Sequence, residues 1–361
     1  MRVLHTNAGE VWSGIEQRIF FIARYLKKKG VWCALALSPN SPLRIRAEEE
    51  GIKVFPVKMR GKWGLSGVRI LRDILQREKI TLLHTHRSTD HWMSYLASRK
   101  TGVILIRTRH NYTPISPNPL NHLLYHRATH HLIAVADIIG KYLTGVYKIP
   151  PHRVTVIPSA VDVERFLSNR EDLREELGIS PEIPVIGMVG RLRKHKDYPT
   201  FIRFASLFLE EVPRAKFLIS GDGPLENELK KMVRRRKLED RIIFLGKRRD
   251  VEKVLRTLDV FVLTSVLEGS PAVIKEAILS EVPVVATRVG GINEIIRDGE
   301  GGFLVNPGSP EEIKNCVLHI LNNPSVVKEG VRKAGERIRE VYSPDRLGEK
   351  TLSLYENLHN S

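Results

Sequence analysis

Short apolar runs alternate with longer amphipathic stretches along the first half of this chain. The short runs are typical of strands and the amphipathic stretches of helices. Residues 103–108 are mostly apolar, as expected of a strand buried on both faces of a sheet. Such alternation predicts βαβ units on a parallel sheet. The predicted strands are 2–6, 31–38, 52–57, 80–85, 103–108 and 131–135, and the predicted helices include 14–29 and 66–79.

The same pattern starts again after Pro158, and the interruption within 156–166 places a domain boundary there. We predict two doubly wound α/β domains, 1–160 and 161–342, followed by a last helix over 343–361. Open α/β sheets bind ligands at the carboxyl ends of their strands, so two such sheets facing across a cleft would bring two substrates together. The second domain's predicted strands are 184–190, 215–220, 241–245, 260–264 and 283–287, and its predicted helices are 198–212, 225–237, 251–257 and 271–280.

Positive charge is concentrated in the first half. The chain has 361 residues and a formal net charge of +17. Residues 1–160 hold 25 basic and 9 acidic residues (net +16), whereas residues 161–361 hold 33 and 32 (net +1). This asymmetry indicates an anionic partner for the first half: nucleic acid, a membrane surface or a phosphorylated substrate. A basic surface that only keeps the protein soluble is the alternative.

A turn followed by a helix in the second domain fits recognition of a phosphate and a sugar. The first amides of a helix attract an anion through unpaired N–H groups and the helix dipole. Two carboxylates beside such a site would repel phosphate, so we expect them to hold sugar hydroxyl groups. An ordinary capped core helix with two solvated glutamates is the alternative. The candidates are Glu268 for catalysis and Gly269, Ser270, Ala272, Val273 and Glu276 for donor binding.

Two further turns follow strands of the second domain. The first holds Gly190, Arg191 and Lys196. A bidentate Arg and a point-charge Lys suit a leaving diphosphate that gains charge as its bond breaks, although a solvated basic loop is the alternative. The second turn holds Gly221 and Gly223, which permit tight turning or close approach to a ligand. A plain turn is the simpler explanation of this glycine pair.

The first domain offers a glycine and several histidines. Gly14 joins the first strand to the first helix and could let the backbone approach phosphate or sugar. His84 and His86 share a face near a strand end, but the spacing supplies no evident third metal ligand. Hydrogen-bonded histidines at a sheet edge are the alternative for most of them. His110, which follows the strand 103–108, is the histidine that we expect to be catalytic.

Several familiar signatures are missing from the sequence. No Asp-x-Asp pair offers ligands for a divalent cation on a diphosphate, and neither a Walker A sequence nor a Gly-x-Ser-x-Gly elbow occurs. No apolar run approaches the ~18 residues of a membrane-spanning helix, and the N-terminus lacks the apolar stretch of a signal peptide. Two cysteines are too few for a disulfide scaffold. We expect a cytoplasmic protein without a metal or other cofactor.

Together these residues resemble the retaining glycosyltransferases of family 4, which have the GT-B fold, over essentially the whole chain. The most specific element is the pair of glutamates with seven residues between them, Glu268 and Glu276. Arg191 and Lys196 match the Arg/Lys pair that neutralises the donor diphosphate in this family. The resemblance also implies that the last helix, 343–361, crosses back onto the first domain.

The resemblance assigns roles to individual residues. Glu276 would bind the donor ribose, and Glu268 with the amides that follow it would hold the transferred sugar. His110 would match a first-domain histidine near the donor sugar. Gly14 would match the second glycine of a Gly-Gly-x-Glu loop, whose first glycine is Ser13 here.

The implied reaction moves a hexose- or heptose-type sugar from a nucleoside-diphosphate donor, with a UDP-sugar expected, and retains the anomeric configuration. Backbone around Leu245 would form the pocket for the base. The acceptor would be a glycan or glycolipid of lipopolysaccharide or cell-envelope biosynthesis, bound by the first domain. Two alternatives remain: a non-hydrolysing sugar-nucleotide epimerase on the same fold, and a basic nucleic-acid-binding protein. The low aromatic content of 7% argues against the latter.

One basic segment of the first domain has the composition of a membrane-surface element. Residues 57–65 are rich in Lys and Arg, and Trp63, Leu65, Val68 and Leu71 can share an apolar side. Such a segment suits anionic lipid and would place the protein on the inner face of the cytoplasmic membrane. A core-facing helix with a basic rim is the alternative.

Overall fold

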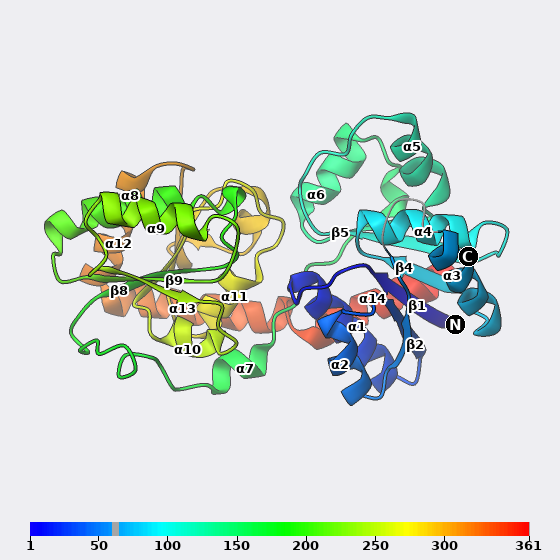
Figure 1. Cartoon of the computed structure of the whole chain (residues 1–361), viewed down its shortest axis with the longest axis horizontal. Coiled ribbons are helices and arrows are strands. Elements are labelled where there is room, and N and C mark those ends of the chain that lie inside the picture. Colours follow the sequence, from blue (N-terminus) through cyan, green and yellow to red (C-terminus); the bar gives the residue numbers. More distant parts are fainter. Residues whose placement is uncertain (60–64, 361) are drawn as a thin grey trace. The chain divides into compact units, whose positions relative to one another are not determined.

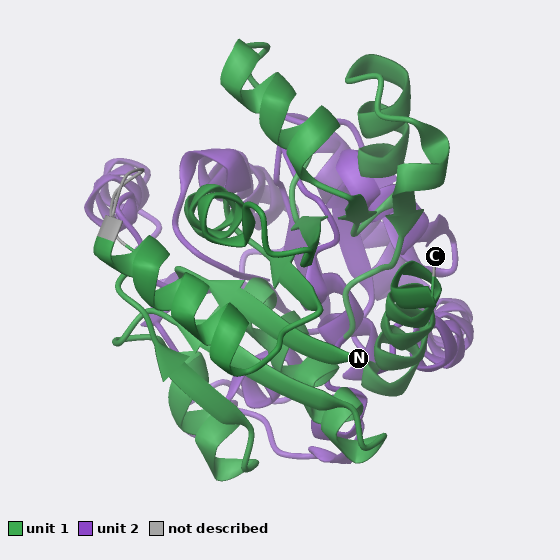
Figure 2. Cartoon of the chain, turned by 90° about the vertical axis from the view of Figure 1, so that its right-hand side faces the viewer, with its two compact units in different colours: residues 1–160, 344–361 green, residues 161–343 purple. Residues whose placement is uncertain are grey.

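The computed structural model describes residues 1–59 and 65–360, and the chain divides into two compact units. Unit 1 comprises Met1–Ala160 and Pro344–Ser361, and unit 2 comprises Val161–Ser343 (Figure 2). Each unit contains a parallel sheet with helices packed against it (Figure 1).

Among the described residues of unit 1, seven strands form a sheet in the order β3-β2-β1-β4-β5-β6-β7. Neighbouring strands pair in parallel, and His5 of β1 lies opposite His84 of β4 in the register. The strands are β1 (Arg2–Asn7), β2 (Trp32–Leu37), β3 (Lys53–Pro56), β4 (Leu82–Thr85), β5 (Ile104–Arg109), β6 (His131–Ala134) and β7 (Val154–Val156). The α-helices are α1 (Gly14–Lys28), α2 (Pro42–Glu49), α3 (Leu65–Arg77), α4 (Ser88–Ser98), α5 (Pro119–His122), α6 (Asp137–Lys141) and α14 (Pro344–Asn360).

Helix α14 is the end of the chain, yet it packs against α1 within unit 1. Gly348 makes this contact close: a Cβ atom at that position would lie 2.1 Å from Cγ of Tyr25. Tyr355 is fully buried in a hydrophobic cluster with Val3, Phe21 and other residues of α1 and the sheet. The final helix therefore completes the core of unit 1.

Unit 2 repeats the architecture with the strand order β10-β9-β8-β11-β12-β14-β13. Its core is one large cluster, in which Phe201, Phe204 and Phe208 of α8 stack edge-on against Phe217 of β9. The strands are β8 (Val185–Val189), β9 (Lys216–Ser220), β10 (Ile242–Gly246), β11 (Val260–Leu263), β12 (Val284–Thr287), β13 (Arg297–Asp298) and β14 (Gly301–Val305). The α-helices are α7 (Val163–Ser168), α8 (Tyr198–Glu211), α9 (Glu226–Arg235), α10 (Val251–Arg256), α11 (Ala272–Leu279), α12 (Pro310–Asn322) and α13 (Pro324–Val341).

The predicted fold class is confirmed: the chain has two doubly wound parallel sheets, and its last helix returns to the first of them. The predicted strands are all present with ends shifted by a few residues, but the prediction omitted β7, β13 and β14.

The described part of the basic segment in unit 1 favours a core-facing helix. Val68 is 8% exposed and Leu71 is fully buried, and both pack in a cluster with residues of β1 and β4. Trp63 lies outside the described residues. In the part of the chain that the structure covers, no helix has the length and apolar character needed to cross a membrane.

Candidate active site

The point where strand order reverses in unit 2 lies between β8 and β11. Chain connections leave this point in opposite directions, so the loops after the two strands diverge and make room for a ligand. The loop after β8 carries Lys196, and the loop after β11 carries Glu268. Both were candidates from the sequence.

Lys196 and Glu268 form a close ion pair at this edge of the sheet. Their Nζ and Oε1 atoms are 2.6 Å apart, and the two side chains are only 14% and 11% exposed. The Ser265 hydroxyl donates to the same carboxylate oxygen at 2.6 Å. A partly dehydrated ion pair with a further hydrogen bond is held in a defined geometry. Glu268 thus holds the Lys196 ammonium group in place and partly offsets its positive charge.

Hydrogen bonds also join the two loops that carry this pair. The Thr264 hydroxyl lies 2.9 Å from the carbonyl oxygens of Lys196 and Asp197, and Val266 N–H donates to the carbonyl of His195 at 2.8 Å. The polypeptide turns at Asp197, whose φ is +48°, and the Asp197 side chain then caps α8. The loop backbones therefore position Lys196 before any ligand binds.

Arg191 is placed differently from Lys196. Its Nε lies 3.9 Å from Oδ1 of Asp222 in the turn after β9, and its side chain is 43% exposed. At that distance and exposure the ion pair contributes little to stability. Arg191 is thus a solvated cation on the same sheet edge, able to change its rotamer at low cost.

The turns after β8 and β9 pack against each other, and their glycines make this possible. A Cβ atom at Gly221 would lie 1.9 Å from the carbonyl oxygen of Gly190, and one at Gly223 would lie 2.5 Å from that of Leu192. The missing side chains therefore serve the close approach of the two loops. Contact of Gly190, Gly221 and Gly223 with a donor stays a prediction.

The start of α11 presents positive electrostatic potential at the same edge. Pro271 is its N-cap residue, no side chain caps the first turn, and no acidic residue lies in that turn. The amides of Ala272 and Val273 belong to the orphan N–H groups that every helix leaves at its start. Ser270 is held by Lys275, whose Nζ donates to its hydroxyl at 3.1 Å. The geometry suits an anion beside Gly269 and Ser270.

Glu276 lies further along α11 and is partly buried. Burial raises the pKa of its carboxyl to about 7, and the nearby cations Arg165 and Lys275 only partly oppose this effect. A carboxyl that titrates near neutral pH can accept a hydrogen bond in one state and donate one in the other. This matches a group that holds hydroxyl groups.

Leu245 marks an irregularity in β10. The β10–β9 register shifts between Phe244 and Gly246, so Leu245 is the extra residue of a β-bulge. A bulged residue leaves its own backbone groups outside the ladder. Backbone groups outside the ladder at this point are compatible with the predicted base pocket.

Gly290, which is not among the candidates predicted from the sequence, shapes the loop that carries Glu268. Its φ is +55°, and a Cβ atom there would lie 1.9 Å from the carbonyl oxygen of Glu268. Only glycine allows this approach, which fixes the backbone just before Gly269. The Gly290-Gly291 pair is the signal that could have identified it, since adjacent glycines after a strand often mark a tight turn.

In unit 1, the loop after β1 is held by a buried carboxylate. Glu16 is fully buried, and its Oε1 accepts hydrogen bonds from Arg87 at 2.6 Å and Asn7 at 2.8 Å. Ser13 caps α1 and donates to the other oxygen of Glu16. Gly14 has open space where a side chain would begin. Ser13 thus caps α1 and at the same time ties the loop after β1 to the Glu16 carboxylate.

His110 lies directly after β5 and is partly exposed. Behind it, His5, His84 and His86 are buried, with one ring nitrogen of each within 4.8 Å of the others. His5 is the third histidine that the spacing did not reveal, because it lies on a different strand. The group has the composition of a metal site, although the ring nitrogens of all three histidines also have hydrogen-bond partners.

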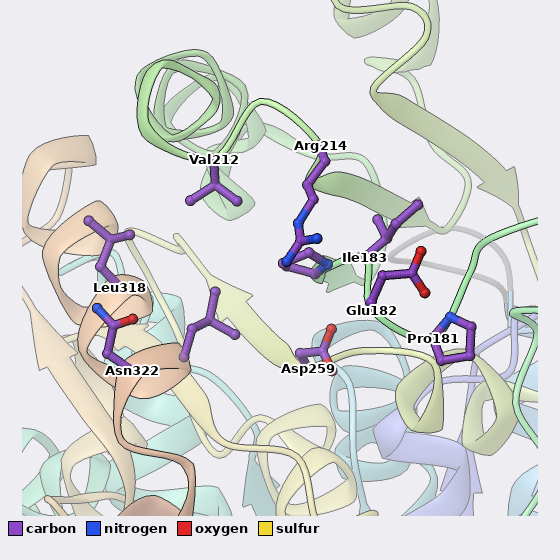
Figure 3. A pocket seen from close by; sticks show the side chains of 10 residues that line it. Pro181, Glu182, Ile183, Val212, Arg214, Asp259, Leu318 and Asn322 are labelled. Carbon is purple, nitrogen blue, oxygen red and sulfur yellow. The ribbon is translucent and has the colours of Figure 1, made fainter.

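A separate hollow of about 360 Å³ lies in unit 2 (Figure 3). Pro184, Asp259 and Arg214 line it, and each precedes a strand of the sheet. Residues before parallel strands lie at the amino edge, opposite the edge that carries Lys196 and Glu268. This hollow is therefore not part of the candidate site.

Comparison with known proteins identifies the chain. A family model described as Glycosyltransferase Family 4 matches residues 12–165, and one described as Glycosyl transferases group 1 matches residues 169–341. The UDP-Gal:alpha-D-GlcNAc-diphosphoundecaprenol alpha-1,3-galactosyltransferase of Escherichia coli is 30% identical over 268 residues, which are 70% of this chain and 69% of that protein. The N-acetyl-alpha-D-glucosaminyl L-malate synthase of Bacillus anthracis is 28% identical over 298 residues, which are 80% of this chain and 77% of that protein.

These matches define a glycosyltransferase. The chain belongs to glycosyltransferase family 4 and is a retaining enzyme that uses a nucleotide-sugar donor. This decides against the epimerase and nucleic-acid-binding alternatives.

Solved structures share the fold over the whole chain. A glycosyltransferase from Rickettsia africae ESF-5 has a TM-score of 0.88 at 21% identity, covering 100% of this chain and 99% of that one. Anabaena Alr3699/HepE in complex with UDP has a TM-score of 0.86 at 20% identity, covering 99% of this chain and 100% of that one.

Proposed function

We propose that this enzyme transfers a sugar from a UDP-sugar to a glycan or lipid-linked acceptor of the bacterial cell envelope, without a metal ion. The observation that carries the proposal is the Lys196–Glu268 pair beside the start of α11, at the point where strand order reverses in unit 2. Relatives support the donor and acceptor classes: the Escherichia coli relative is a UDP-Gal enzyme acting on a diphosphoundecaprenol-linked sugar, and the Anabaena structure contains UDP.

The proposed chemistry is dominated by charge that develops on the leaving diphosphate. Lys196, Arg191 and the amides at the start of α11 would stabilise that charge through preorganised positive potential. Lys196 is already oriented by Glu268, so little reorganisation is needed during the reaction. The family resemblance implies a route without a covalent intermediate, and we propose departure and attack on the same face of the sugar.

The roles of the other candidates follow from their positions. Glu276 would accept hydrogen bonds from the ribose hydroxyl groups, and backbone at the Leu245 bulge would contact the base. Glu268 and the amides after Gly269 would hold the transferred sugar. His110 of unit 1 would act near the donor sugar, as the family resemblance implies.

Kinetics of variants at Lys196 and Arg191 test the proposal. We expect Lys196→Ala to lower kcat by about 10²–10³, the range observed when one donor to a developing anion is lost. Arg191→Ala is expected to lower kcat by a similar factor, because its solvated side chain would engage the diphosphate only as charge develops. Arg193→Ala is the matched control, since Arg193 is an exposed cation of the same loop. Steady-state rates with UDP-sugars, measured with and without excess EDTA, give the result.

Unchanged kcat in both variants would end the proposed mechanism. Loss of activity in EDTA, restored by a divalent cation, would instead show that a metal ion carries the charge. Lys196→Ala leaves the Glu268 carboxylate unpaired, so its thermal stability is measured alongside its kcat. In the double variant with Glu268→Gln, removal of both charges should restore the stability lost in Lys196→Ala. The kcat of the double variant does not separate an electrostatic role of Lys196 from a structural one, because Glu268 is itself proposed to hold the transferred sugar.

Contact with an anionic membrane through unit 1 is a further part of the proposal. The net charge of +16 over residues 1–160 supports it electrostatically, although Val68 and Leu71 are buried and supply no apolar anchor. Sedimentation with vesicles should therefore show binding that needs anionic lipid and weakens as salt rises. Equal binding to neutral vesicles would contradict this.

A further inference from the structure

Four histidines, a tyrosine and a threonine of unit 1 form one continuous hydrogen-bond chain. It begins at the partly exposed His110 after β5 and ends in the core of the unit. Each histidine inside it uses both ring nitrogens. The successive contacts are His110 Nε2 to His86 Nδ1 at 3.2 Å, His86 Nε2 to His5 Nδ1 at 3.0 Å, His5 Nε2 to Tyr355 Oη at 3.3 Å, Tyr355 Oη to His84 Nδ1 at 2.5 Å, and His84 Nε2 to Thr108 Oγ1 at 2.7 Å.

Parallel pairing places these groups together. His5 and His84 are register partners on β1 and β4, while Thr108 comes from β5 and Tyr355 from α14. His5, His84, Thr108 and Tyr355 are fully buried, and His86 is 2% exposed. The hydrogen bonds of the chain are therefore shielded from water, and only His110 is partly exposed. Nε2 of His110 faces His86, so Nδ1 of His110 is the nitrogen left for a ligand.

Proton counting allows two arrangements of this chain. A neutral imidazole carries one N–H, so each histidine donates at one nitrogen and accepts at the other. If the Tyr355 hydroxyl donates to His5, then His5 donates to His86, and His86 donates to His110. His110 then carries its proton on Nδ1. If Tyr355 donates to His84, every bond reverses and Nδ1 of His110 becomes an acceptor.

The inner end of the chain favours the first arrangement. There, the Thr108 hydroxyl donates to Nε2 of His84. In the reversed arrangement Thr108 accepts from His84, and its own proton has no acceptor among the hydrogen bonds of the described residues. A buried donor without a partner is unfavourable, because it gives up its hydrogen bond to water and gains none in return. The arrangement that satisfies Thr108 also places a proton on Nδ1 of His110.

Surrounding charges keep the chain neutral. Burial lowers the pKa of His110 well below its ordinary value, and the guanidinium groups of Arg18, Arg107, Arg87 and Arg109 lower it further. Arg18 on α1 is itself buried, and its Nη1 donates to the carbonyl oxygens of Ile157 and Pro158. An added proton is therefore unfavourable, and proton counting with neutral rings applies.

A metal ion fits this cluster less well. Both ring nitrogens of His5, His84 and His86 already have hydrogen-bond partners. A cation would have to break several of these bonds, close to the Arg18 guanidinium, whose charge reaches His5, His84 and His86. Hydrogen bonding explains all six nitrogens without an ion.

We propose that this chain holds His110 as a neutral hydrogen-bond donor, with Nδ1–H directed to a hydroxyl oxygen of the substrate. His110 then cannot serve as a general base unless the whole chain reverses. Tyr355, His5, His84 and His86 are positioning residues that set its tautomer. The inference rests on the proposed function only in giving His110 a sugar ligand.

Nitrogen NMR of the intact enzyme labelled with ¹⁵N-histidine tests the tautomer directly. We expect His110 to be protonated at Nδ1, and the Tyr355→Phe variant to lose this preference because the phenol proton no longer sets the direction. His110→Gln assigns the signal. Protonation at Nε2 in the wild-type enzyme, an unchanged tautomer in Tyr355→Phe, or a stoichiometric metal ion that survives dialysis would each overturn the proposal. This readout needs no sugar donor, so it stands apart from the proposed function.

Kinetics then separate positioning from packing. His86→Leu removes the donor to His110, and we expect kcat to fall about tenfold. His86→Asn can still donate through its amide and should recover most of that loss. His131→Gln is the matched control, because buried His131 bonds the Thr155 hydroxyl in the same way but lies outside the chain. Equal rates for His86→Leu and His86→Asn would overturn the proposal, and His86→Asn also serves if Tyr355→Phe fails to fold.

Discussion

At the residue scale, Glu276 links folding stability to ligand binding through one proton. Burial raises its pKa from 4.5 to about 7, so the folded chain keeps a proton that the unfolded chain has already lost. Between these values, stability must fall as pH rises, and above pH 7 the cost is constant. Glu276→Gln removes this cost. We expect the variant to be more stable than the wild type at pH 8 and equally stable at pH 4, as measured by urea unfolding.

The same carboxyl should control affinity for the donor. Only the carboxylate accepts from two ribose hydroxyl groups, so UDP should bind more tightly as pH rises through about 7. In Glu276→Gln, affinity should be about 10- to 100-fold weaker and lose this pH dependence, since a hydrogen bond to a charged group contributes about 1.5–3 kcal/mol. Calorimetric titration measures both. Glu228→Gln, an exposed glutamate on α9, should behave as the wild type. A stabilised variant with unchanged UDP affinity would remove Glu276 from the donor site.

At the scale of elements, the loop after β11 depends on the short helical turn at Gly290–Glu294. In Gly290→Ala, the new methyl group would collide with the Glu268 carbonyl oxygen, now 1.9 Å from the Cβ position. The displacement would move Glu268 away from Lys196. We expect kcat/KM to fall at least tenfold, because small shifts of charged groups weaken stabilisation of a developing anion.

Gly308→Ala is the control for this glycine. Gly308 also has a positive φ, +75°, but nothing lies within 4 Å of its Cβ position. Both substitutions carry the strain of a left-handed backbone, about 1–2 kcal/mol. Gly290→Ala must also displace the Glu268 backbone, so it should lower thermal stability more than Gly308→Ala does, and only Gly290→Ala should lower kcat/KM. Equal activity of the two variants would show that the close approach has no catalytic consequence.

Elements with a regular pattern could be predicted from the sequence, whereas those shaped by distant contacts could not. Strands such as β8 (Val-Ile-Gly-Met-Val) and β11 (Val-Phe-Val-Leu) have continuous apolar runs, so the local sequence already indicates that they are buried. Strand β14 begins with Gly301 and Gly302, which resemble a turn. In the structure, a Cβ atom at Gly302 would lie 1.8 Å from the carbonyl oxygen of Val284 on β12. Glycine is there because of a neighbour 18 residues away, and no local pattern contains that information.

The candidate site shows the same division. The placement of Lys196 and Glu268 at one sheet edge could be predicted because strand-to-helix turns collect there, whereas their roles and that of Glu276 stay predictions. The partnership of His5 with His84 depends on β1 lying beside β4, and that of Tyr355 on the return of α14. Strand order and chain return are tertiary facts that a single sequence leaves open.

At the scale of the whole molecule, unit 1 is built from both ends of the chain. Tyr355 and Leu347 of α14 are buried in a cluster with Val3, Phe21 and Ile22. Burying one large apolar side chain contributes about 1.5–3 kcal/mol, against a typical domain stability of about 5–15 kcal/mol. We therefore expect residues 1–160 alone to lack a cooperative urea transition by circular dichroism. Residues 161–343, whose core is complete, should show one.

A joined version of unit 1 distinguishes a missing helix from a need for unit 2. The chain leaves and re-enters unit 1 at neighbouring points, because Val161 N–H donates to the Tyr342 carbonyl at 3.0 Å within unit 2. A linker of about eight Gly/Ser residues, spanning about 15 Å on average, can thus connect Ala160 to Pro344. This version should regain cooperative unfolding, and Gly348→Val within it should abolish the gain, since Tyr25 occupies the space of the new side chain. Cooperative folding of residues 1–160 alone would instead show that unit 1 can fold without α14. In that case α14 would still supply Tyr355 to the histidine chain, but it would not be needed for the fold of the unit.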